Sequence, residues 1–244
     1  MKTSLVSFCF AIATPMFFSS CDSSKEDSGS DGASTGLVEK VLTKEEQEAL
    51  TPDDVIASLK AGNERFVNND LTARDHSKQV RESTLKQFPK AIVLSCVDSR
   101  VPVEDVFDRG IGDIFVARVA GNFINDDILG SMEFATKVSG SKLVLVLGHE
   151  HCGAVKAAVD DVKLGNITAM LAKIRPVVEA STYEGERTAA NPEFVHQVCG
   201  ENVKYNIEQI RERSPIMAEM EKNGEIKIVG AVYDMDNGKV VFFD

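Results

Sequence analysis

Apolar residues along this chain form two kinds of pattern. Some stand in short unbroken runs rich in β-branched residues, such as AIVLS and KLVLVL, which is typical of strands buried on both faces of a sheet. Asn237-Gly238, near the carboxyl terminus, favours a tight hairpin turn between two further runs. The pattern predicts strands at 91–95, 114–116, 142–147, 226–233 and 239–243.

Other apolar residues recur at helical spacing between these runs. Thr43 and Glu46 form a capping box, and Pro52 after Thr51 suits the first position of a second helix. A helix beginning at Cys152 is expected to end at Gly165, because glycine commonly closes helices. Further helices are predicted at about 129–138, 169–180, 194–211 and 215–222.

Strands that alternate with helices predict an α/β fold. The sheet is expected to be central and mainly parallel, flanked by helices on both faces, with an antiparallel strand at its carboxyl-terminal edge. The 244 residues suffice for one domain of this type.

The amino terminus has the pattern of an export signal. Lys2 precedes an apolar run, and the small residues Ser19 and Ser20 stand just before Cys21, which resembles the lipobox of bacterial lipoproteins. We therefore expect a signal peptide at 1–20, a lipidated Cys21 opening a flexible tether at 21–42, and the domain at 43–244. This predicts a protein of the periplasm or cell surface that meets the membrane through its lipid only. A cleaved secretory signal followed by a polar tail is the alternative.

Acidic residues outnumber basic ones by 38 to 27, which gives a formal net charge of −11. A chain of this charge repels phosphate backbones, which argues against nucleic acid as a partner.

The cysteines of the domain are an odd set, which is a poor basis for disulfides. Cys96, Cys152 and Cys199 remain once Cys9 and Cys21 are assigned to the amino terminus. Cys199 falls within a predicted helix, where we expect it to be a small buried apolar residue. Metal ligation is the leading role for the other two.

Two groups of metal-binding residues follow predicted strands. Cys96 comes directly after the first strand, and His149 and Cys152 come after the third. Ligands of parallel α/β sheets bind at the carboxyl ends of strands, and sulfur with imidazole favours zinc. Three protein ligands would leave the fourth position open, as in catalytic sites. Spacing alone also allows His151 in place of His149, and it allows two structural cysteines with an unrelated histidine.

A third feature makes the pattern more specific. Cys96 is followed at alternate positions by Asp98 and Arg100. A carboxylate and a guanidinium so placed can pair, and the pair can accept a hydrogen bond at the metal or set the charge around it.

The segments SCVDSRVP, DIFVARVAGN and LGHEHCGAV resemble, in order and spacing, the characteristic segments of the β-class carbonic anhydrases. The resemblance is close over 51–162 and looser beyond. It implies one Zn²⁺ on Cys96, His149 and Cys152, and a hydrogen-bonding dyad of Asp98 and Arg100. It also implies substrate-binding positions at Gln87, Phe115, Ala120, Phe134 and Gly153.

The resemblance further implies a reaction and an assembly. Zinc lowers the pKa of water to about 7, so that hydroxide can attack carbon dioxide to give bicarbonate. The family implies a homodimer or tetramer in which the amino-terminal helices, 43–66, embrace the partner. Val93 stands where some members carry the tryptophan of an inhibitory bicarbonate site, so no such site is expected. Two alternatives are hydrolysis of carbonyl sulfide or carbon disulfide, and a zinc protein without catalysis.

Overall fold

The computed structural model describes residues 36–243. The expected signal peptide, Cys21 and most of the expected tether lie outside the described residues. Among the helices of 36–243, none combines the length and apolar character required to cross a bilayer.

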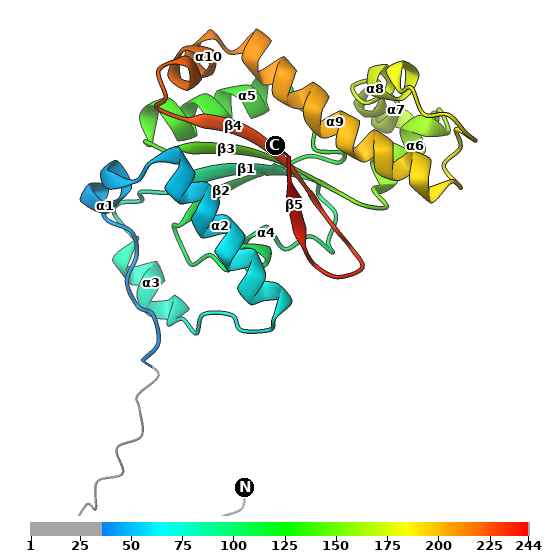
Figure 1. The fold of residues 1–244 in the computed structure, drawn as a ribbon. Coiled ribbons are helices and arrows are strands. Elements are labelled where there is room, and N and C mark those ends of the chain that lie inside the picture. Colours follow the sequence, from blue (N-terminus) through cyan, green and yellow to red (C-terminus); the bar gives the residue numbers. More distant parts are fainter. Residues whose placement is uncertain (1–35, 244) are drawn as a thin grey trace, which may run out of the picture. The chain divides into compact units, whose positions relative to one another are not determined.

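A five-stranded sheet lies at the centre of the described chain, in the order β2-β1-β3-β4-β5 (Figure 1). The first four strands in this order are parallel to one another, and β5 is antiparallel to β4. This confirms the predicted α/β class and the antiparallel edge. The strands are β1 (Ala91–Ser95), β2 (Ile114–Arg118), β3 (Leu143–His149), β4 (Lys227–Tyr233) and β5 (Val240–Phe242).

The helices begin where the sequence supplies caps. Thr43 and Glu46 form the predicted capping box, and Thr51 forms a second one with Asp54, ahead of Pro52. The helices are α1 (Lys44–Ala49), α2 (Pro52–Val67), α3 (His76–Glu82), α4 (Val103–Val106), α5 (Asp126–Glu133), α6 (Gly153–Val159), α7 (Gly165–Leu171), α8 (Arg175–Ala180), α9 (Pro192–Arg213) and α10 (Pro215–Lys222), with a π-helical turn, η1 (Phe134–Val138), directly after α5.

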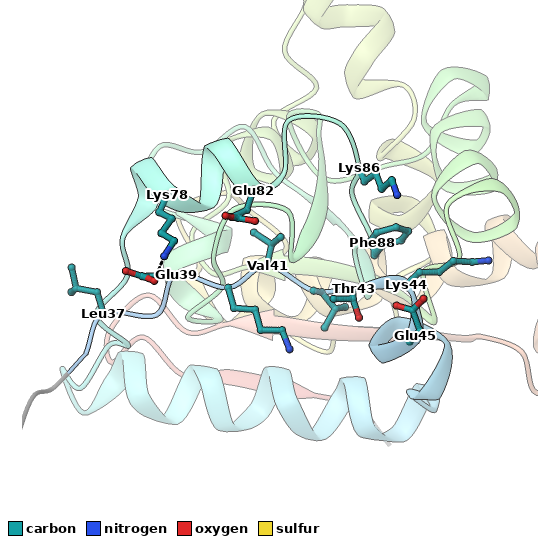
Figure 2. Close-up of a pocket in the computed structure, with 12 residues that line it drawn as sticks. Leu37, Glu39, Val41, Thr43, Lys44, Glu45, Lys78, Glu82, Lys86 and Phe88 are labelled. Carbon is teal, nitrogen blue, oxygen red and sulfur yellow. Dashed lines mark hydrogen bonds and ion pairs between the residues drawn. The ribbon is translucent and has the colours of Figure 1, made fainter.

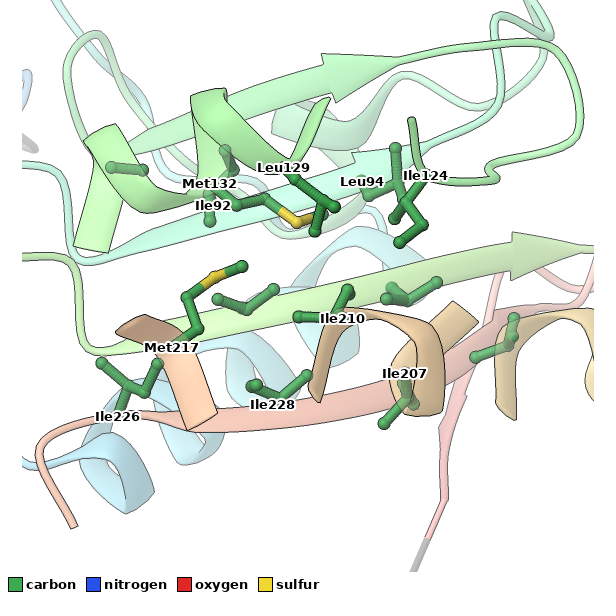
Figure 3. Packing of buried hydrophobic residues seen from close by; sticks show 14 of the residues in the cluster. Ile92, Leu94, Ile124, Leu129, Met132, Ile207, Ile210, Met217, Ile226 and Ile228 are labelled. Carbon is green, nitrogen blue, oxygen red and sulfur yellow. The ribbon is translucent and has the colours of Figure 1, made fainter. Parts of the chain in front are cut away.

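Successive residues of β1 enter two different cores, as strand geometry requires. Ile92 and Leu94 pack in the cluster that α5, α9 and α10 cover, which Figure 3 shows from close by. Ala91 and Val93 pack on the other face, against the cluster that includes Val55 of α2. Each fully buried aliphatic side chain contributes about 1.5–3 kcal/mol, so these clusters fix which face of β1 meets which helix.

The connection after β3 differs from the prediction. Gly165 begins α7 instead of ending a long helix, and α6 ends at Val159. Gly165 has a φ of +42°, a backbone conformation that glycine adopts readily. Such a conformation fits the start of a helix as well as its end. The predicted helix at 169–180 is accordingly two helices. The short helices α3 and α4 were not predicted, and α5 begins earlier, after the cap of Asn125.

A third cluster closes the carboxyl end of the sheet. It packs residues of α6, α7 and α8 against the first half of α9, and it includes Cys96, Cys152 and Cys199. All three cysteines are buried and free, as was expected of Cys199. The predicted metal ligands therefore sit in a buried apolar setting.

A surface groove of about 800 Å³ lies elsewhere, between the segment before α1 and helix α3 (Figure 2). Lys78 of α3 pairs with Glu39 across it. Lys86 and Phe88 also line this groove, and they precede β1. The groove thus lies toward the amino end of β1, whereas Cys96 follows its carboxyl end.

Candidate metal centre

The parallel pairing of β1 with β3 brings the predicted ligands together. Leu94 lies opposite Val146, so Cys96, just beyond β1, stands level with the end of β3. His149 is the last residue of β3, and Cys152 caps the start of α6. The ligand atoms of Cys96, His149 and Cys152 all lie within 4.8 Å of one another, and all three residues are buried.

The ring of His149 is oriented by its own backbone. Its Nδ1 lies 2.8 Å from the carbonyl oxygen of Glu150. A carbonyl only accepts hydrogen bonds, so Nδ1 carries the proton and Nε2 presents its lone pair. This Nε2 is buried and has no hydrogen-bond partner among residues 36–243. A buried acceptor without a partner beside two sulfurs is the arrangement expected of metal ligands, so the residues fit zinc.

The two sulfurs behave as one acid-base pair. The hydrogen bond from Cys152 lowers the pKa of Cys96 against the opposing effect of burial, and the backbone N–H of Gly121 lowers it further. The same contact and then burial raise the pKa of Cys152. The two sulfurs therefore share one proton between them. A divalent metal would displace that proton and hold both sulfurs as thiolates.

Asp98 and Arg100 form the predicted pair. Oδ1 of Asp98 accepts hydrogen bonds from the Arg100 backbone N–H at 3.0 Å and from Nε at 2.9 Å, and Oδ2 accepts one from Nη2 at 2.8 Å. The Arg100 side chain is the main reason that the pKa of Asp98 falls to about 2, against the opposing effect of partial burial. Asp98 is therefore ionised at neutral pH. Its Oδ2 also lies 3.9 Å from Nε2 of His149, next to the candidate ligands.

His151 lies apart from this group. It is half-buried, has a φ of +53°, and is not among the three residues whose ligand atoms converge. The structure thus favours His149 over His151, an alternative that spacing alone had left open.

The residues expected to bind substrate fall into two sets. Ala120 precedes Gly121, whose N–H donates to Cys96 Sγ, and Gly153 follows Cys152, so these two adjoin the candidate centre. Phe115 instead lies opposite Ile92 of β1. Ile92 is four residues before Cys96, which separates the two positions by about 13 Å along the strand. Phe134 packs edge-on against Phe115, with ring centroids 6.3 Å apart.

Gln87 belongs to the distant set. It is exposed and precedes β1, at the end of the strand opposite Cys96. Within one chain, Gln87, Phe115 and Phe134 therefore do not face the cysteines and His149.

Sequence reasoning missed the hydrogen bond to the first ligand. The backbone N–H of Gly121 lies 3.3 Å from Cys96 Sγ, and the carbonyl of the same glycine accepts from Asn202, on α9. Polar residues on the buried face of a helix were the available signal, since Asn202 and Asn206 stand one turn apart there.

Comparison with known proteins identifies related sequences and folds. The family model described as carbonic anhydrase matches residues 91–240. Carbonic anhydrase 2 of Mycobacterium tuberculosis is 36% identical over 191 residues, which cover 77% of this chain and 90% of that protein. A carbonic anhydrase of Mycolicibacterium smegmatis is 36% identical over 187 residues, covering 75% of this chain and 89% of that protein.

Solved structures show the same fold. The β-carbonic anhydrase CcaA superimposes with a TM-score of 0.61 at 23% identity, over 79% of this chain and 87% of that one. A β-carbonic anhydrase from Coccomyxa, in complex with acetazolamide, gives 0.60 at 24% identity, over 80% and 86%. One of two tetrameric β-carbonic anhydrases from Sordaria macrospora gives 0.60 at 20% identity, over 78% and 94%.

Proposed function

Because this chain belongs to the carbonic anhydrase family and to its β class, we propose that it hydrates carbon dioxide reversibly with one Zn²⁺ held by Cys96, His149 and Cys152. The observation that carries the proposal is the convergence of two sulfurs and the unpartnered Nε2 of His149 within 4.8 Å, in a buried setting. Two sulfurs and one imidazole suit zinc better than the harder divalent ions, and three protein ligands leave one tetrahedral position open.

Zinc in such a site supplies a hydroxide nucleophile at neutral pH. The chain's own residues would hold and orient it. The carboxylate of Asp98, ionised and 3.9 Å from His149 Nε2, could accept a hydrogen bond from the nucleophile and so turn its lone pair toward the substrate carbon. Arg100 binds both carboxylate oxygens, so it holds Asp98 in that orientation and keeps it ionised.

The expected substrate-binding residues lie in two separate places within one chain, which points to an assembly of copies. β2 is an edge strand, and all five of its residues are only half-buried in the single chain. Phe134, beside it, is 51% exposed. We propose a homodimer about a two-fold axis that passes through this edge perpendicular to β2, so that the two copies of β2 run in opposite directions. Gln87, Phe115 and Phe134 of one copy would then come near the metal ligands of the other. Pairing of such dimers would give a tetramer.

Export and a lipid anchor at Cys21 remain a proposal that the amino-terminal sequence supports. Wild type and Cys21→Ser would be fractionated and their intact masses measured. A diacylglycerol-sized mass on wild type alone, in the membrane fraction, supports the anchor. Equal release of both proteins without added mass favours the secretory signal.

The test of the function combines metal analysis with kinetics. The protein purified without added metal should contain about one zinc per chain, and stopped-flow assays with a pH indicator should show carbon dioxide hydration that a zinc chelator abolishes and zinc restores. Parallel assays with carbonyl sulfide and carbon disulfide measure the alternative substrates. Bound zinc without turnover of any of the three would leave a non-catalytic zinc protein.

A further inference from the structure

Two asparagines are buried completely on the face of α9 that covers the sheet. Asn202 and Asn206 are 0% and 1% exposed, and they stand one helical turn apart among aliphatic residues such as Val203 and Ile207. A buried amide without partners costs several kcal/mol on a cyclohexane scale, so each must have specific hydrogen bonds.

Those hydrogen bonds lead to one loop. Nδ2 of Asn202 donates to the carbonyl oxygen of Gly121 at 2.9 Å, and Oδ1 of Asn206 accepts from the backbone N–H of Ile124 at 2.8 Å. Nδ2 of Asn206 also donates to the backbone carbonyl of Asn202 at 2.8 Å and to its Oδ1 at 3.2 Å. Asn206 therefore orients the Asn202 side chain, and the two amides hold both ends of the segment 121–124.

The same loop contacts the first metal ligand. The N–H of Gly121 donates to Cys96 Sγ at 3.3 Å, from a residue with a φ of +85°. Gly121 is also tightly packed at its Cα, because a Cβ added there would come within 2.4 Å of Ile174 Cδ1. Gly121 is thus held by its carbonyl on one side and packed on the other, with its N–H directed at the sulfur.

We propose that Asn202 is a positioning residue for the metal centre, acting through Gly121 on the sulfur of Cys96. This inference rests on the proposed zinc function. An N–H donated to a thiolate takes up part of its charge and fixes the direction of its lone pairs. Without Asn202 the Gly121 carbonyl loses its buried partner, and the loop can turn. The lone pairs of the Cys96 sulfur are then less fixed in direction, and the thiolate donates electrons to the metal with a different strength.

The experiment compares three buried substitutions. Asn202→Leu removes the hydrogen bond to Gly121, and Asn206→Leu removes only the groups that orient Asn202 and Ile124. Thr136→Val is the matched control, because Thr136 is equally buried and its hydroxyl donates to Met132, within α5 and η1 and away from this loop. Each protein would be measured for zinc affinity by chelator competition, for the sulfur-to-cobalt absorption band after cobalt substitution, and for its urea unfolding midpoint.

We expect Asn202→Leu to bind zinc about 10–100-fold more weakly, which is the usual range for residues that support metal ligands, and to shift the cobalt band. Asn206→Leu should show a smaller change in both, and Thr136→Val should lower only the unfolding midpoint. Asn202→Ser, a smaller change, is measured in the same way in case the leucine variant does not fold.

The inference is wrong if the folded Asn202 variants bind zinc within about threefold of wild type with an unchanged cobalt band, since the amide then serves stability alone. Failure of the proposed function looks different, because wild type itself would then bind no zinc or leave carbon dioxide unhydrated.

Discussion

Oδ2 of Asp98 lies 3.9 Å from Nε2 of His149, the atom that has no hydrogen-bond partner in the described part of the chain. The same Oδ2 accepts a hydrogen bond from Arg100 at 2.8 Å. The carboxylate thus stands beside the candidate metal position with its charge already engaged by a guanidinium. This relationship separates the roles of the two residues, and it can be tested by changing each of them.

Asp98→Asn should lower kcat/KM for carbon dioxide hydration about 100-fold or more, because an amide with its NH₂ group turned inward cannot accept from the nucleophile. Zinc content should stay at the wild-type level, since Asp98 is outside the ligand group. Stopped-flow kinetics and metal analysis measure the two effects. Asp160→Asn, an exposed surface acid, serves as the control. Wild-type kinetics in the Asp98 variant would remove this residue from the mechanism.

Arg100→Ala should raise the pKa of Asp98 from about 2 toward its ordinary value near 4, because the guanidinium supplies the largest lowering effect. Carbon-13 NMR of labelled aspartate, titrated between pH 6 and 2, reports this shift. A pKa that stays near 2 would show that the backbone N–H of Arg100 suffices to hold it.

Cys96→Ser should lose most of its zinc and with it the activity, because a hydroxyl is a much poorer zinc ligand than a thiolate. Cys199→Ala is the matched variant, since Cys199 is also free and buried but lies outside the ligand group. Metal analysis of both proteins should give near zero for the first and the wild-type content for the second. Equal zinc content in the two would contradict the ligand assignment.

Gly121→Ala should destabilise the protein by about 1–3 kcal/mol, because alanine at positive φ is strained and its Cβ would collide with Ile174. Gly130→Ala is the control within α5, where nothing lies within 4 Å of the added methyl group. That change should be neutral or stabilise by about 0.5–1 kcal/mol through helix propensity. Urea unfolding measures both, and similar costs at the two positions would argue against a constrained Gly121.

Asp108 predicts a pH dependence of stability. Burial raises the pKa of this carboxyl, but hydrogen bonds from Arg74, Thr72 and Arg65 outweigh it and set the pKa to about 2. In the unfolded chain the Asp108 carboxyl has a pKa near 3.9, so between about pH 5 and 2 it binds more protons there than in the folded protein. The stabilisation of about 2 kcal/mol is therefore complete above about pH 5 and is lost as the pH falls through about 2.

Unfolding free energies of wild type and Asp108→Asn, measured from pH 6 to 2.5, should therefore converge as the pH falls. Asp126→Asn is the control, because that side chain is 95% exposed and its difference from wild type should stay near zero throughout. A gap between wild type and Asp108→Asn that does not change with pH would contradict the assignment.

Phe134→Glu should convert the proposed dimer into a monomer that retains zinc but loses activity, because a charge would enter the β2 edge. Val241→Glu places the same charge on the opposite edge strand, where Val241 is 59% exposed, and should leave the dimer intact. Sedimentation analysis with metal analysis and kinetics tests both. A fully active wild-type monomer would refute the division of the site between copies.

The sequence predicted those parts of the fold that depend on local patterns. AIVLS is buried at every position, so its apolar run identifies β1 without ambiguity. The ends of β1 and β3 then located the candidate ligands, because parallel strands finish at the same edge. Gly165 failed as a signal because the same backbone freedom serves a helix start and a helix stop. Helix α4 is a single turn, too short for a periodic face.

Contacts between distant residues were beyond such patterns. The hydrogen bond from Asn202 to Gly121 joins positions 81 residues apart, and it requires the path of α9 over the sheet. The separation of Phe115 from the metal ligands was equally beyond them, because it depends on the pairing of β1 with β2, which places Phe115 opposite Ile92.

The parallel register of β1 and β3 also limits how this chain can change over evolution. Connections away from the metal centre, such as the exposed residues 184–187 between α8 and α9, tolerate changes in length, because an insertion there alters only a loop. One residue inserted between Ala91 and Cys96 would move every later side chain of β1 to the opposite face of the sheet, turning the sulfur away from His149. Lineages derived from this fold should therefore accumulate insertions and deletions outside these five positions while the strand keeps its length.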